Sequence, residues 1–233
     1  MRRVLLVIPV YNEAATLPQV LAAVKRLWPG EILVVDDGST DATPDIVKGE
    51  GVKLVRHPNN RGYGAALLSG FAWAERQGYH WVITMDADGQ HEPAFLPEFL
   101  DRIQATQADI VSGSRYLDPR LAQGPSPEDR RWVNRAITAL LRELTGYPLT
   151  DAFCGFKAYR LAALRQLPLQ EQGYAFAVEL WIKAAYAGLK LEEIPVPLIY
   201  YDFEKGVGRC PARERLAVYL EAAARALRWT CSS

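Results

Sequence analysis

The sequence predicts an α/β fold with a mostly parallel central sheet, helices on its faces and a mixed C-terminal part. Short apolar runs alternate with amphipathic segments through the first half of the chain. Such alternation is typical of strand–helix–strand units, whose strands are parallel. The first run, Val4 to Val10, is continuously apolar, which indicates a strand that is buried on both faces.

The remaining elements of the first half follow in order. Apolar residues at helical spacing mark the first helix: Leu17, Val20, Leu21, Val24 and Leu27. Strands are then expected at residues 32–35, 53–55, 81–85 and 110–112, with helices between them at residues 41–48, 65–76 and 93–106. Pro44 lies in the first turn of the second helix, where a missing N–H is tolerated.

The pattern changes after Arg115. Residues 118–129 are rich in proline, glycine and charge, which predicts a mobile loop that serves as a lid beside the sheet. The next helix carries apolar residues at Val133, Ala136, Ile137, Leu140, Leu141 and Leu144. A strand at 155–159, a helix at 177–187, a strand at 191–201 with two prolines and a helix at 212–229 complete a single expected domain over residues 1–233.

Composition narrows the class of protein. The 233 residues are 49% hydrophobic, enough for the core of one large domain, and the formal net charge of +0 does not favour nucleic-acid binding. The cysteines, Cys154, Cys210 and Cys231, are odd in number and far apart, which argues against disulfides and a zinc site and fits a reducing cytoplasm. No window approaches the roughly 18 apolar residues that a membrane-spanning helix needs, and the N-terminal run is too short for a secretory signal.

Polar residues follow four of the predicted strands at the point where each strand ends. Ligands bind beyond the carboxyl ends of the strands in an open parallel sheet, so these segments are expected to meet in one cleft. They are residues 9–13 (PVYNE), 36–41 (DDGSTD), 86–91 (DADGQH) and 113–116 (GSRY).

Asp86 and Asp88 form the most informative pair. Because they stand two apart at a strand end, their carboxylates project to the same side and repel each other unless a cation lies between them. Mg²⁺ and Mn²⁺ bind one or two carboxylates together with phosphate oxygens. The alternative is a solvated turn that caps the helix near Pro93. His91 fits a metal ligand beside Asp88 or a supporting or structural role, and the second is favoured because no second histidine is near.

Other polar segments have two interpretations each. Asp36 and Asp37 fit hydrogen bonding to a ribose or base, or a simple turn in which Asp41 caps a helix. The segment 12–13 fits a binding site or a helix entry. Gly62-Tyr63-Gly64 is only weak evidence for phosphate binding, because Leu67 stands where a dinucleotide fingerprint has its third glycine.

Taken together, these motifs resemble the family 2 glycosyltransferases of the GT-A fold, and more narrowly the dolichyl-phosphate (polyprenyl-phosphate) mannose synthase-like branch. The resemblance runs from about Val4 to Arg209. It rests on the order and spacing of IPVYNE, VVDDGSTD, NNRGYGAALLSG, MDADGQH, SGSRY, DAFCGFKAYR and GYAFAVELWIKAAYAGLKLEEIPV.

The resemblance implies a role for each matching residue. The nucleotide-binding positions are Pro9, Tyr11, Glu13 and Asp37, and the Mg²⁺ or Mn²⁺ and diphosphate site is Asp86 and Asp88 with Gln90 beside them. Arg115 corresponds to a position that meets donor or acceptor phosphate, with further basic residues at Arg130 and Arg131 and family motifs around Asp151 and Glu179. Residues 1–115 would bind the nucleotide sugar, 116–211 would face the acceptor, and 212–233 would form a C-terminal amphipathic helix.

The resemblance implies inverting transfer of a hexose from a GDP-mannose or UDP-glucose type of donor to polyprenyl phosphate. A phosphate monoester is already a nucleophile at pH 7 and needs cations rather than a base. Arg115, Arg130, Arg131 and Arg209 could supply them. A rival reaction is transfer to a hydroxyl of a soluble or glycolipid acceptor, with Asp151 or Glu179 as base. A sugar-nucleotide-forming nucleotidyltransferase and a non-catalytic, membrane-peripheral binding protein are less favoured.

The C-terminal part departs from the branch. Its usual R-x-x-G-x-S-K pattern reads FEKGVGR here, so that Phe203 replaces arginine, Gly208 replaces serine and Arg209 replaces lysine. The last helix compensates in charge, with five arginines against two glutamates from Arg209 to Arg228 around an apolar side. That side either packs on the domain or lies on the surface of an anionic membrane. In the second case the protein would be cytoplasmic and lie at the inner face of the membrane.

Overall fold

A computed structural model describes residues 2–124, 126–199 and 210–230. Its main sheet contains β1 (Val4–Val10), β2 (Ile32–Asp36), β3 (Lys53–Arg56), β4 (Trp81–Thr84), β5 (Ile110–Ser114), β7 (Lys157–Arg160) and β8 (Leu191–Pro195). The strands are arranged in the order β3-β2-β1-β4-β7-β5-β8. The predicted parallel core is confirmed, because β1 pairs in parallel with β2 and β4, and β2 with β3.

The mixed part of the sheet comes from β7, which runs antiparallel to both of its neighbours, β4 and β5. β7 follows the long helix α5 (Glu128–Thr145), and its first residue, Lys157, pairs with Thr84 at the end of β4. The start of β7 therefore lies at the edge where the parallel strands end. Residues that precede this strand consequently lie beside residues that follow the others.

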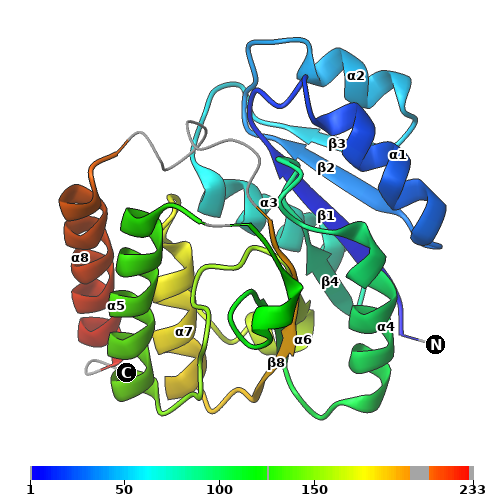
Figure 1. Ribbon diagram of the computed structural model, residues 1–233. Coiled ribbons are helices and arrows are strands. Elements are labelled where there is room, and N and C mark those ends of the chain that lie inside the picture. Colours follow the sequence, from blue (N-terminus) through cyan, green and yellow to red (C-terminus); the bar gives the residue numbers. More distant parts are fainter. Residues whose placement is uncertain (1, 125, 200–209, 231–233) are drawn as a thin grey trace.

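Helices cover both faces of the sheet and form two separate cores (Figure 1). Alternate residues of β1 supply them, with Leu5 and Val7 on one face and Leu6 and Ile8 on the other. One face is covered by α1 (Leu17–Leu27), α2 (Thr43–Gly49) and α4 (Leu96–Ala105). The other is covered by α3 (Tyr63–Arg76), α5, α6 (Leu161–Leu164), α7 (Phe176–Tyr186) and α8 (Ala212–Thr230).

Several predicted boundaries are wrong for local reasons. The strand expected at 191–201 is divided into β8 and the short β9 (Leu198–Ile199), because Pro195 and Pro197 each lack the N–H that a continuous ladder needs; residues 200–201 lie outside the described ranges. The helix expected at 93–106 begins with a separate 3₁₀ turn, η1 (Pro93–Phe95). The sequence pattern did not predict α6.

The segment expected to be a mobile loop is partly ordered. It contains the 3₁₀ turn η2 (Pro119–Leu121) and β6 (Ala122–Gln123), and β6 pairs in parallel with β9. The helix α5 already begins at Glu128, inside the range predicted as loop. Of residues 118–129, only residue 125 lies outside the described part of the chain.

The last helix packs on the domain through one of its faces. In Figure 1, α8 lies beside α5 and α7. Its buried face consists mainly of small side chains, Ala222, Ala223 and Ala226, together with Tyr219, whose ring centroid lies 4.6 Å from that of Phe153. No helix in the described residues is long and apolar enough to cross a bilayer.

Candidate functional site

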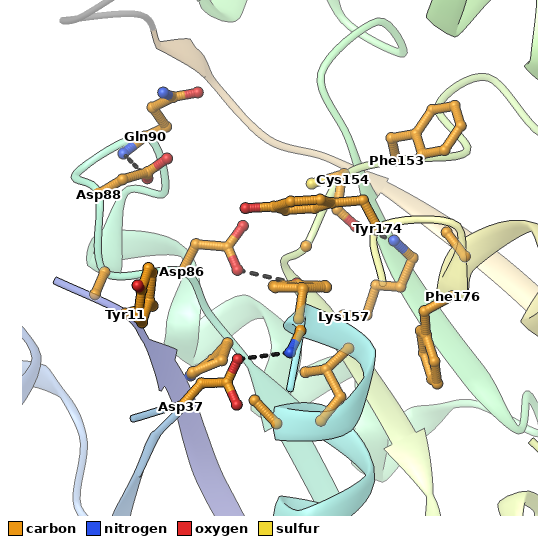
Figure 2. Close-up of a pocket in the computed structure, with 18 of the residues that line it drawn as sticks. Tyr11, Asp37, Asp86, Asp88, Gln90, Phe153, Cys154, Lys157, Tyr174 and Phe176 are labelled. Carbon is orange, nitrogen blue, oxygen red and sulfur yellow. Dashed lines mark hydrogen bonds between the residues drawn. The ribbon is translucent and has the colours of Figure 1, made fainter. Parts of the chain in front are cut away.

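A cavity of about 750 Å³ lies at the carboxyl ends of the parallel strands and is extended by α5, α7 and α8. Sequence-predicted residues that line it are Pro9, Tyr11, Glu13, Asp37, Asp86, Asp88, Gln90, Arg115 and Arg130. The polar strand ends therefore converge as expected. Figure 2 shows Tyr11, Asp37 and Asp86 along one side of this cavity, with Tyr174 and Phe176 on the other.

Asn12 joins the ends of β1 and β2. Its backbone has a positive φ of 56°, a conformation that asparagine tolerates better than most residues. Its side-chain oxygen accepts a hydrogen bond from Thr40 N at 2.8 Å, and its own N–H donates to Ser39 Oγ at 2.9 Å. Asn12 is not the N-cap of α1, which is Thr16, but the backbone oxygen of Glu13 accepts hydrogen bonds at the entry to that helix.

Asp37 organises the loop that leads into α3. Its buried carboxylate accepts hydrogen bonds from Gly62 N at 2.7 Å and Arg61 N at 3.0 Å, and it lies 2.6 Å from His57 Nδ1. Figure 2 shows one of these bonds beside the cavity. Position 62 requires glycine for two reasons. Its φ is 105°, and a Cβ there would overlap the carbonyl oxygen of Gln172. Asp37 thus shapes this side of the cavity through its own hydrogen bonds.

Asp86 and Asp88 lie in the loop after β4, and backbone and side-chain contacts orient both. Tyr63 Oη donates to Asp86 Oδ1 at 3.0 Å, and Gln90 N donates to Asp88 Oδ1 at 2.9 Å. Burial raises the pKa of Asp86, and burial together with the neighbouring Asp86 charge raises that of Asp88. The two carboxylates therefore destabilise each other electrostatically when no cation is present.

His91 supports this loop from behind. Its Nδ1 accepts a hydrogen bond from Asp86 N at 2.9 Å, and its ring stacks on Phe156 with centroids 5.3 Å apart. Burial lowers the pKa of His91 to about 4, so the imidazole is neutral at physiological pH. These contacts agree with the structural role that the sequence predicts for this residue.

Arg115 and Asp151 form a buried ion pair. Arg115 Nε and Nη2 donate to the two carboxylate oxygens of Asp151 at 2.6 and 2.9 Å, and Asn134 Nδ2 donates to the same carboxylate. Burial alone would raise the pKa of Asp151, but the Arg115 charge and these hydrogen bonds hold it well below its usual range. Asp151 does not line the cavity; it positions Arg115, which does.

Two further sequence-predicted residues also lie away from the cavity lining. Glu179 pairs with Lys183 at 2.7 Å and accepts hydrogen bonds from the backbone N–H groups of residues 170 and 171, so its carboxylate holds a loop in place. Arg131 is exposed on α5. Arg209 lies outside the described residues. The structure therefore does not bring Glu179 or Arg131 into the cavity wall.

The cavity also contains residues that the sequence reasoning missed, namely Cys154, Gly155 and Lys157 at the start of β7 and Arg215 on α8. Lys157 is buried and donates to the carbonyl oxygen of Cys154. Burial lowers the pKa of Lys157 and raises that of the Cys154 thiol to about 11, which argues against a thiolate nucleophile. The sequence pattern indicates residues that follow strands, whereas β7 brings residues from before a strand to the same edge.

Comparison with known proteins identifies the family. The model of the family described as glycosyl transferase family 2 matches residues 5–167, more than half of the chain. The chain belongs to glycosyl transferase family 2. This glycosyltransferase is 34% identical over 206 residues to the undecaprenyl-phosphate mannosyltransferase of Micrococcus luteus, a match that covers 84% of each protein.

A second relative of this glycosyltransferase is the polyprenol monophosphomannose synthase of Mycolicibacterium smegmatis, 33% identical over 224 residues that cover 89% of this chain and 81% of the relative. Among solved structures, glucosyl-3-phosphoglycerate synthase from Mycobacterium tuberculosis in complex with phosphoglyceric acid superposes with a TM-score of 0.76 at 22% identity, covering 96% of this chain and 80% of that one. The same enzyme with Mn²⁺, uridine diphosphate and glucosyl-3-phosphoglycerate gives a TM-score of 0.74. These likenesses confirm the predicted GT-A fold.

The position of Asp86 in this family 2 glycosyltransferase depends on the absence of a side chain at Gly155. A Cβ at position 155 would overlap the Asp86 carboxylate and lie 2.8 Å from Tyr63 Oη. We expect Gly155→Ala to displace Asp86 and lower turnover roughly tenfold or more, because small misplacements in an active site are costly. Steady-state kinetics at saturating Mn²⁺ measures this.

Gly49→Ala is the matched control for that substitution. Gly49 lies in α2, and no other atom comes within 4 Å of a Cβ built there. This control should retain full activity. Normal kinetics in Gly155→Ala would show that the loop tolerates a shift of Asp86.

Proposed function

We propose that this glycosyltransferase moves a hexose, with inversion, from a nucleotide-diphosphate sugar to polyprenyl phosphate. The observation that carries the proposal is the mixed lining of the cavity. Asp86 and Asp88 line it together with Arg115, Arg130 and Arg215 and with an apolar wall. The names of the two relatives support the same acceptor class.

The acidic pair, Asp86 and Asp88, fits the donor. Its two partly exposed carboxylates offer the hard oxygen ligands that Mg²⁺ and Mn²⁺ prefer. The described residues contain no group of three or more histidine, cysteine, aspartate or glutamate side chains that could hold a metal ion. Asp86 and Asp88 would thus hold the ion, which when bound neutralises charge on the diphosphate. Pro9, Tyr11, Glu13 and Asp37 line the adjoining wall and would hold the nucleotide of a GDP-mannose or UDP-glucose type of donor, with Gln90 beside the diphosphate.

The arginines and the apolar wall fit an amphipathic anion. The apolar side chains of Val133, Phe153, Phe176, Leu180 and Tyr219 line the same cavity as the arginine side chains. Such a wall suits a hydrocarbon chain, whereas guanidinium groups suit its phosphate. Because a polyprenyl acceptor resides in a bilayer, the working enzyme would lie at the inner face of the membrane.

In the proposed reaction, a phosphate oxygen of the acceptor attacks the anomeric carbon of the sugar. The bond from this carbon to the diphosphate breaks, and the nucleoside diphosphate leaves. No protein base is required. The rival transfer to a hydroxyl would need one, but Asp151 and Glu179 are both held in structural hydrogen bonds outside the cavity lining. The geometry favours the phosphate acceptor.

This mechanism predicts a simple dependence on pH. The second pKa of a phosphate monoester is about 6, so the rate with polyprenyl phosphate should fall as the pH drops below that value and stay level just above it. A pH series of initial rates at saturating donor and Mn²⁺ measures the effect. An apparent pKa near 7 or above that persists with several acceptors would point to a protein base instead.

The decisive experiment has two stages. UDP- and GDP-sugars are screened with Mn²⁺ for thermal stabilisation, and each stabilising donor is then tested for transfer to polyprenyl phosphate and to the corresponding polyprenol. We expect transfer to the phosphate alone. Equal transfer to the alcohol would contradict the proposed acceptor.

A further inference from the structure

Arg215 is an unusual arginine because it is almost completely buried and still lines the cavity. It lies near the start of α8, and only 5% of its surface is exposed. The residue reaches this position because α8 packs its alanine-rich face against α5 and α7 (Figure 1). The charged end of α8 is thereby brought to the cavity, whose lining also contains Arg130.

The hydrogen bonds of the Arg215 guanidinium are incomplete. Its Nη2 donates to the carboxylate of Asp129 in the first turn of α5. Within the described ranges, its Nε has no hydrogen-bond partner. A buried N–H of a charged group without a partner is costly, and such groups commonly become satisfied when a ligand binds. Asp129 is half-exposed, so its charge is better screened by solvent than that of Arg215.

The surroundings of Arg215 indicate which ligand would satisfy it. Arg130 lines the same cavity one residue after Asp129, and the tilted, contacting rings of Phe153 and Tyr219 supply apolar surface in the same cavity. The helices α5 and α8 both begin at this end, and the N-terminus of a helix favours negative charge. Two arginines, two helix N-termini and an apolar wall match a phosphate that is attached to a hydrocarbon chain.

We infer that Arg215 binds the phosphate of the prenyl-phosphate acceptor through its Nε edge, while Asp129 holds the other side of the guanidinium. This inference rests on the proposed function for the nature of the acceptor. It assigns to α8 a direct part in acceptor recognition, in addition to its packing role.

Three substitutions separate this role from a purely structural one. Arg215→Gln removes the charge, and Arg215→Lys retains the charge without the planar fork. Asp129→Asn removes the charge of the partner but keeps a side-chain oxygen that can accept the hydrogen bond from Arg215 and hold it in place. If Arg215 only fastens α8 to α5, Arg215→Gln and Asp129→Asn should behave alike. If it binds phosphate, only the Arg215 variants should affect the acceptor strongly.

The test is steady-state kinetics with farnesyl phosphate as a short acceptor and the donor selected by the thermal screen. We expect Arg215→Gln to raise the acceptor KM roughly tenfold or more, as for loss of a hydrogen bond to a charged group. The donor KM should stay within about twofold, and Arg215→Lys should recover part of the loss. Equal rises in Arg215→Gln and Asp129→Asn, or an unchanged acceptor KM in Arg215→Gln, would overturn the inference.

A binding measurement separates failure of this inference from failure of the proposed function. Farnesyl phosphate is titrated calorimetrically into each variant with Mn²⁺ and the nucleoside diphosphate present, which needs no turnover. Weaker binding in Arg215→Gln alone supports the assignment even if wild-type protein transfers sugar to another acceptor. Unchanged binding in Arg215→Gln contradicts it, whatever the reaction is.

Discussion

The Asp88→Asn variant is expected to lose metal-dependent donor binding and to reduce turnover on the order of 10²–10³-fold, while the fold stays intact. The substitution keeps the shape of the side chain but removes one of the two charges that would hold the ion. Because Asp86 and Asp88 destabilise each other in the metal-free protein, the variant should unfold at the same or a higher temperature without metal. Calorimetric titration of nucleoside diphosphate with and without Mn²⁺, together with thermal unfolding, measures both effects.

Asp101→Asn is the matched control for this prediction. Asp101 is an exposed residue of α4, on the sheet face covered by α1 and α2. Its substitution also removes one negative charge but should leave donor affinity and turnover unchanged. If Asp88→Asn bound the nucleoside diphosphate with wild-type affinity in Mn²⁺, the assignment of the acidic pair to the metal would be wrong.

The Asp151→Asn variant is expected to be the least stable of the substitutions considered. It leaves the Arg115 guanidinium without its bidentate partner in a site where the Asp151 carboxylate is fully buried. Loss of one partner of a buried pair costs about 3–5 kcal/mol, a large share of a typical free energy of unfolding. Urea denaturation monitored by circular dichroism measures the loss.

An exposed arginine–aspartate pair provides the comparison. Arg120 pairs with Asp118 at 2.8 Å on the surface, so Asp118→Asn should cause no measurable change in the urea midpoint. Acceptor affinity should also fall in Asp151→Asn, because Arg115 lines the cavity and loses its orientation. Wild-type stability in Asp151→Asn would mean that Arg115 finds another partner and that Asp151 does not position it.

Sequence patterns were sufficient to predict the parallel half of the protein and the acidic pair in its cavity. The apolar run from Val4 to Val10 and its successors are local signals, because a doubly buried strand must be apolar along its length. Once the strands are parallel, their carboxyl ends share one edge, so segments as distant as Tyr11 and Asp88 are brought together by topology alone. The family resemblance added roles for these positions.

Only the tertiary structure decided the rest of the cavity. β7 is inserted antiparallel between β4 and β5 and thereby brings Gly155 and Lys157 to the cavity. This arrangement depends on pairing between distant segments, which no local pattern encodes. Whether Asp151 and Glu179 face a ligand or hold the fold was likewise decided by their hydrogen-bond partners. The amphipathic pattern of α8 was compatible with a membrane as well as with the domain, and packing against α5 and α7 placed Arg215 in the cavity wall. Periodicity shows that a helix has an apolar face, but the surface that covers this face is chosen by the whole fold.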